Sequence, residues 1–269
     1  MPLGGPDALL SLACSSGTAV LGVAMEWIQT GLVERVVAGG FEALSEYCYA
    51  GLSSLRAMSR NMREVLKLRQ FWYLALWNIC AVGTLFSFGT MWAGPYLMDA
   101  YGLNKIEAGR ILLFQGLGVL ILVPVFGSLA DRLNSRRGMI IACSALGFIG
   151  SCGLAFFAGS LPPALLAGTI MIMAASAAGG NTCTMSLVKR NLPHNMIGTG
   201  VGCVNMFWPI TTAVLNLLLG LMLRLFLTPD ATTAQAYGHT LLVYVGLWAV
   251  ALGLGIFCLR EHFAVSRSA

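Results

Sequence analysis

One charged stretch interrupts the apolar part of the sequence: Gly127-Ser128-Leu129-Ala130-Asp131-Arg132-Leu133-Asn134-Ser135-Arg136-Arg137-Gly138. Long runs without Asp, Glu, Lys or Arg lie on both sides of it. A bilayer accounts for this pattern, because apolar runs of about 20 residues can span the hydrocarbon core while the charges stay in water. We therefore predict that the stretch is a loop at which the chain turns round between two membrane spans.

The composition also favours a membrane protein. Of the 269 residues, 57% are hydrophobic and 10% are charged, whereas ordinary soluble domains carry about 25% charged residues. The net charge of +5 is uneven: residues 1–59 hold two basic and five acidic side chains (−3), and residues 60–269 hold fourteen and six (+8). This shift predicts two segments of different origin joined near residue 60. The eight cysteines form no CxxC pair and the three histidines are far apart in the sequence, so we expect no metal site. We also expect no cofactor and no nucleic-acid partner.

Residues 60–269 predict a mainly α fold with six membrane helices. A basic lead-in at 60–70 precedes a membrane domain at 71–262, and residues 263–269 form a tail. Residues 138–188 are too long for one span and are divided at Pro162 and Pro163, since proline ends helices. The expected spans are 70–98 (with a kink near 89–95), 111–130, two within 138–188, one within 196–223 and one at 238–259.

The distribution of Lys and Arg predicts the orientation. Eleven lie on the side of the bilayer that holds both ends of the membrane domain, and three lie on the other side. Because cytoplasmic loops carry the excess of Lys and Arg, we expect both ends to be cytoplasmic. The expected location is the inner (plasma) membrane, with the lipid bilayer as one partner.

Polar side chains within the spans are candidates for lining a cavity. No Asp, Glu, Lys or Arg lies inside the predicted spans, although ion pathways usually contain one. Ser and Thr hydroxyls such as those of Thr84, Ser144, Thr184 and Thr211 are expected to bond back to their own helix. Amides are costlier to bury, and interhelical hydrogen bonds are the alternative explanation for them. The candidates are Asn78, Gln115, Asn181 and Asn205.

Six spans with a Gly-x-x-x-Asp-Arg stretch after the second resemble one half of a major facilitator superfamily transporter, over about residues 63–262. The signature loop of that family runs Gly-x-Leu-x-Asp-Arg-x-Gly-Arg-Arg/Lys. Asn134 stands where the family has its second glycine, and Asn is the next-best residue for a left-handed turn. The spacing to Arg136 is one residue longer. The matching residues are Gly127, Leu129, Asp131, Arg132, Arg136 and Arg137.

The resemblance carries expectations about function. It implies transport of a small-molecule solute, with ion pairs of the charged stretch favouring one state of the access cycle. It places the cavity among the first, second, fourth and fifth spans. The basic lead-in and the short tail indicate a C-terminal half, and family transporters pack two such halves. A second half or a second copy of the chain is therefore an expected partner.

Residues 1–59 predict a different, α/β fragment. Residues 9–13 and 35–40 have the pattern of buried strands, each followed by a helical pattern. The turn Ala13–Gly17 and the segment Ala38–Leu44 resemble the active-site region of the thiolase-fold β-ketoacyl synthases, which implies that Cys14 is an acyl-accepting nucleophile. A cysteine at a helix N-terminus is more easily ionised. The His or Asn partners that this chemistry requires are absent from the sequence.

Three interpretations therefore remain open. The chain is a transporter half, a membrane-anchored fragment of an acyl-condensing enzyme, or an inactive fusion of the two with its junction near Ser59 and Arg60. The missing partners of Cys14 disfavour the enzyme.

Overall fold

The structure, a computed structural model, describes residues 27–28, 31, 64–193, 196–227 and 232–261. The chain divides into two compact units, residues 1–53 and 54–269. In the first unit only Trp27, Ile28 and Gly31 are described. The β-ketoacyl synthase-like fragment with Cys14, and the junction predicted near residue 60, lie outside the described residues and stay predictions.

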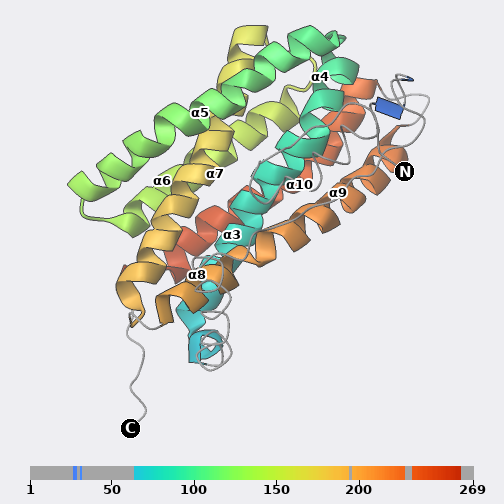
Figure 1. Cartoon of the computed structure of the whole chain (residues 1–269). Helices are drawn as coiled ribbons and strands as arrows, with labels where there is room; N and C mark the ends of the chain where they lie inside the picture. Colours follow the sequence, from blue (N-terminus) through green and yellow to red (C-terminus); the bar gives the residue numbers. More distant parts are fainter. Residues whose placement is uncertain (1–26, 29–30, 32–63, 194–195, 228–231, 262–269) are drawn as a thin grey trace, which may run out of the picture. The chain divides into compact units, whose positions relative to one another are not determined.

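The second unit is a bundle of helices (Figure 1). In its described residues, six helical segments are long and apolar enough to cross a membrane, which confirms the predicted number of spans. The helices are α3 (Arg69–Ser87), α4 (Ala93–Tyr101), α5 (Lys105–Arg132), α6 (Arg136–Phe156), α7 (Pro163–Asn191), α8 (Ile197–Asn205), α9 (Phe207–Phe226) and α10 (Thr233–Gly253), with π-helical turns η2 (Phe88–Trp92) and η4 (Leu254–Cys258).

Several helix ends differ from the sequence-based boundaries. The prediction of a loop over residues 127–138 is wrong, because α5 continues to Arg132 and α6 begins at Arg136. At the other end of α5, Asn104 and Glu107 form a capping box that starts the helix at Lys105, although residues 105–110 were expected in a loop. Charged side chains at helix ends can extend into water while their backbone stays helical, so charge marks the membrane boundary but not the helix boundary.

Two spans are interrupted, each about four residues before a proline, although Pro124 lies within the unbroken helix α5. A proline removes the hydrogen bond to the carbonyl four residues earlier. In the first span Pro95 cannot donate to the carbonyl of Met91, within η2, so the π-helical turn falls where a kink was predicted. In the fifth span Pro209 likewise cannot donate to the carbonyl of Asn205, where α8 ends before α9 begins.

Helices α3 and α7 pack against each other in the middle of the bundle. Helix α7 also packs against α5 and α6, α3 packs against α9 and α10, and α6 packs against α10. Helices α5 and α9 lie at opposite edges (Figure 1). Within the 18-residue apolar stretch of each span, 11% of the residues are buried in α5 and 11% in the span formed by α8 and α9. In the first span, 67% are buried. The bundle therefore has one face, between α5 and α9, where α3 and α7 are not covered by α6 and α10.

Candidate functional site

The turn between α5 and α6 consists of residues 133–135. Asn134 has a φ of 47°, so it adopts the left-handed conformation that its position in the motif predicted; Asn tolerates this conformation better than most residues do. The hydroxyl oxygen of Ser135 accepts a hydrogen bond from the backbone N–H of Gly138 at 3.0 Å. Ser135 thereby caps the N-terminus of α6 and satisfies one of its free N–H groups.

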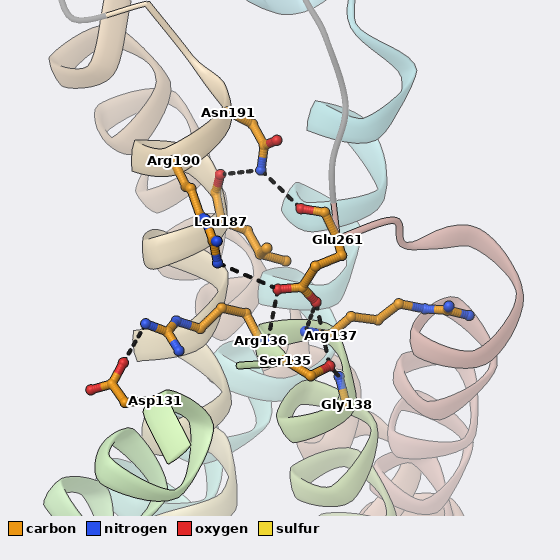
Figure 2. A network of polar contacts seen from close by, with 9 residues as sticks. All are labelled: Asp131, Ser135, Arg136, Arg137, Gly138, Leu187, Arg190, Asn191 and Glu261. Carbon is orange, nitrogen blue, oxygen red and sulfur yellow. Dashed lines mark hydrogen bonds and ion pairs between the residues drawn. The ribbon is translucent and has the colours of Figure 1, made fainter. Parts of the chain in front are cut away.

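Glu261, beyond the last span, completes this cap (Figure 2). Its carboxylate accepts hydrogen bonds from the backbone N–H of Arg136 at 2.9 Å and of Arg137 at 2.8 Å. The hydroxyl of Ser135 donates to the same carboxylate at 3.5 Å. The first N–H groups of a helix have no partner within it, and the helix dipole makes this end positive, so a carboxylate is stabilised there. Glu261 therefore fixes the chain after η4 to the start of α6.

Two residues at the end of α7 also contact Glu261. Arg190 lies 4.0 Å from a carboxylate oxygen of Glu261, and the side-chain amide of Asn191 donates to the backbone carbonyl of Glu261 at 3.2 Å. Only 21% of the Glu261 side chain is exposed. Solvent screens a partly buried carboxylate less than an exposed one, although the Arg190 side chain is itself 43% exposed.

Two further side chains bind the last span directly. The guanidinium of Arg137 donates to the backbone carbonyls of Gly255 and Ile256, at 3.2 and 2.6 Å. The amide of Gln70, at the start of α3, donates to the carbonyl of Cys258 at 3.0 Å and accepts from the N–H of Arg260 at 3.1 Å. We call the whole set the charged cluster; it comprises Gln70, Asp131, Ser135, Arg136, Arg137, Arg190, Asn191 and Glu261.

The residues that match the signature loop of the family, which we expect to gate access, have different roles in this geometry. Asp131 and Arg136 form an ion pair between the end of α5 and the start of α6 (Figure 2). Arg137 binds the last span and not Asp131. Arg132 is exposed and makes no hydrogen bond or ion pair with the described part of the chain. Gly127 is helical, and a Cβ there would meet nothing within 4 Å, so packing within the described chain does not require glycine. Sequence reasoning missed Glu261, which no local motif marks.

The structure brings two of the four candidate amides together. The side-chain amide of Asn78, on α3, donates to the side-chain oxygen of Asn181, on α7, at 2.9 Å. Asn78 is completely buried, and its own side-chain oxygen has no hydrogen-bond partner among the described residues. An unpaired buried oxygen costs about 1–3 kcal/mol. We call Asn78 and Asn181 the amide pair.

The other two candidates lie elsewhere. Gln115, on α5, extends over η2: a Cβ added to Gly89 would lie 2.1 Å from its side-chain nitrogen, so a larger residue there would displace the end of the Gln115 side chain. Asn205 ends α8 and is half-buried. A polar group that sequence reasoning did not single out connects three helices instead. Ser87 donates to the side-chain oxygen of Asn216 at 2.7 Å, and its oxygen lies 2.9 Å from the hydroxyl of Tyr244.

Most membrane hydroxyls bond back to their own helix, as predicted. Each donates to the carbonyl four residues earlier, which satisfies a polar group without any other helix. Ser144 also accepts a hydrogen bond from the indole of Trp77 at 2.8 Å. The hydroxyls that follow the prediction are those of Thr84, Ser144, Thr182, Thr184, Thr211 and Thr212.

The described residues contain no group of three His, Cys, Asp or Glu side chains that could hold a metal ion. The arrangement therefore offers two features for function: a charged cluster that joins helix ends at one end of the bundle, and an amide pair where the two central helices meet.

Comparison with known proteins identifies the family. The family model described as Major Facilitator Superfamily matches residues 10–216 and 74–264, each more than half of the chain. The match does not support the synthase-like fragment predicted for residues 1–59. No curated protein matches the chain. With six membrane-spanning helices and this match, the chain is an integral membrane protein that belongs to the Major Facilitator Superfamily of transporters.

Proposed function

We propose that the bundle is one half of a transport unit that moves a small solute by alternating access. The observation that carries this proposal is the uncovered face between α5 and α9, at which α7 leaves the polar side chains of Asn181 and Thr182 partly or fully exposed. A lipid-exposed polar group in the hydrocarbon region is costly. A second half, or a second copy of this chain, would cover the face and enclose a path for solute.

In this proposal the charged cluster stabilises one access state. It connects the ends of α3, α5, α6, α7 and η4, so these ends move together. Asp131 is the outermost member, with 69% of its side chain exposed, and it lies at the end of α5, beside the uncovered face. The exposed carboxylate of Asp131 is therefore the member that a partner half would contact, while Glu261 holds the cluster together.

Transport is tested with the purified full-length chain in proteoliposomes. We expect uptake of at least one solute from a panel of sugars, amino acids, organic acids and organic amines, compared with protein-free liposomes. Asp131→Asn should change the initial rate by no more than about fivefold, because exposed ion pairs contribute about 0–1 kcal/mol. Glu64→Gln, an exposed carboxylate at the same end of the bundle, is the matched control. Absence of uptake, also after chemical cross-linking into dimers, would contradict the proposal.

The proposed orientation puts the charged cluster in the cytoplasm of an inner (plasma) membrane. Its support is that the Lys- and Arg-rich helix ends lie together at one end of the bundle. We expect a membrane-impermeant maleimide to label Asn134→Cys in inverted vesicles, and Ser160→Cys in intact cells. Labelling of the opposite variant in each preparation would show that the orientation is reversed.

A further inference from the structure

We propose that the amide pair is the hydrogen-bonding contact for an uncharged solute that carries O–H or N–H donors. This inference rests on the proposed transport function and adds the class of substrate. Its three supports are the unpaired oxygen of Asn78, the partial exposure of Asn181 on the uncovered face, and the absence of charged side chains beside both along α3 and α7.

The first support is the unused hydrogen-bonding capacity of Asn78. Its nitrogen is bonded to Asn181, whereas its oxygen has no partner in the described part of the chain. If the amide were turned over, its NH₂ group would be left unpaired instead, so one polar end of a fully buried side chain is unpaired in either assignment. Buried polar groups are normally hydrogen-bonded. A role in joining two helices explains the bonded nitrogen of Asn78 but not its unpaired oxygen.

The second support is access. Asn181 is partly exposed, and Ala178 and Met185, which lie one turn before and after it on the same side of α7, are also partly exposed. Residues spaced by three and four positions share one face of a helix. Helix α7 packs against α3, α5, α6 and α8, and these helices leave this stripe partly exposed. A solute can approach Asn181 along the stripe.

The third support is the electrostatic environment. The nearest charged residue to Asn181 along α7 is Lys189, eight residues away, which is about 12 Å at the helical rise of 1.5 Å per residue. On α3, Asn78 is separated from Arg69 by nine residues. An ion at the amide pair would lose hydration and would find no counter-charge beside it on α3 or α7, which is costly in an apolar surrounding. An amide oxygen can replace only the hydrogen bonds that a neutral donor made with water.

The test measures which charge class of small molecule can reach this stripe. Asn181→Cys in the full-length chain, reconstituted in nanodiscs, is treated with three methanethiosulfonates that carry a neutral hydroxyethyl, a cationic trimethylammonioethyl or an anionic sulfonatoethyl group. Modification is followed by the mass of the intact protein, with the unsubstituted chain as background for the native cysteines. The modification rate with each reagent is divided by the rate of the same reagent at Ser160→Cys, an exposed position in the turn before α7. This ratio corrects for differences in the reactivity of the three reagents toward thiols.

We expect the normalised rate for the neutral reagent to exceed both charged rates by at least about tenfold, because ions are excluded from an apolar membrane interior. Ala178→Cys and Met185→Cys keep the amide pair intact and should show the same order, so the test does not depend on whether Asn181→Cys folds. If a charged reagent reacted at the same normalised rate as the neutral one, the proposed substrate class would be wrong, but the proposed transport function would not be affected. Failure of all three positions to react would overturn the site itself. Reconstituted uptake judges the transport function separately.

Discussion

Glu261→Gln should lower the free energy of unfolding of the bundle by about 2–3 kcal/mol, since a hydrogen bond to a charged group contributes about 1.5–3 kcal/mol. The carboxylate accepts from two backbone N–H groups at the start of α6 and from Ser135. Glutamine keeps one acceptor oxygen, but its NH₂ group then faces an N–H donor. The substitution also removes a negative charge from the positive end of the helix. Unfolding of the purified protein by sodium dodecyl sulfate in mixed micelles measures the change.

Asp131→Asn is the informative comparison, because Asp131 is the other carboxylate of the charged cluster. Its side chain is 69% exposed, compared with 21% for Glu261, so we expect a loss of less than about 1 kcal/mol. Glu64→Gln, an exposed carboxylate, should leave stability unchanged within about 0.5 kcal/mol. If Asp131→Asn destabilised the bundle more than Glu261→Gln, the assignment of Glu261 as the residue that holds the cluster together would be wrong.

Gly118→Ala should separate α5 from α7. A Cβ at Gly118 would lie 2.6 Å from the backbone carbonyl oxygen of Met171, and backbone atoms cannot move aside as a side chain can. Overpacking of this kind costs about 1–3 kcal/mol. Because α5 packs mainly against α7, a clash at this contact acts on the principal attachment of the helix, so we expect a lower unfolding midpoint and a longer distance between spin labels on the two helices.

Gly116→Ala, one half-turn away on the same helix, provides the matched control. A Cβ there would meet nothing within 4 Å, and alanine is a better helix former than glycine by about 1 kcal/mol. The two substitutions are chemically identical, so we expect effects of opposite sign: destabilisation at Gly118 and no change or a gain at Gly116. A loss of the same size at both positions would mean that α5 responds to its helix propensity and not to its contact with α7.

The sequence predicted the features that depend on local composition. Apolar runs free of charge defined the six spans, because the cost of burying charge in lipid acts on each segment separately. Asn134 was correctly assigned to a left-handed turn from its position alone. The break at Met206 precedes Pro209 as the turn η2 precedes Pro95, but Pro124 leaves α5 unbroken, so a proline alone does not predict a break.

Features that depend on contacts between distant segments were not predictable. Glu261 and Arg136 are separated by 125 positions in the sequence, and no periodicity or motif connects a carboxylate after the last span to the N-terminus of α6. The pairing of Asn78 with Asn181 likewise depends on the rotation of α3 and α7 about their axes. From residue type alone, lining a cavity and bonding to another helix were equally good explanations for these amides. Gln115 and Asn205, chosen on the same chemical grounds, lie apart from that pair.

The two bonds of Gln70 have a consequence for the topology of the membrane bundle. The amide of Gln70 is bonded to both Cys258 and Arg260. The start of α3 therefore lies beside the end of η4, so the first and last of the six spans are neighbours and the spans form a closed circuit. A circuit has no obligatory starting point. The order in which the helices are connected is therefore separable from their arrangement in space, and a circular permutant with its ends joined beside Gln70 and reopened in the turn between α6 and α7 would contain every helix contact described above.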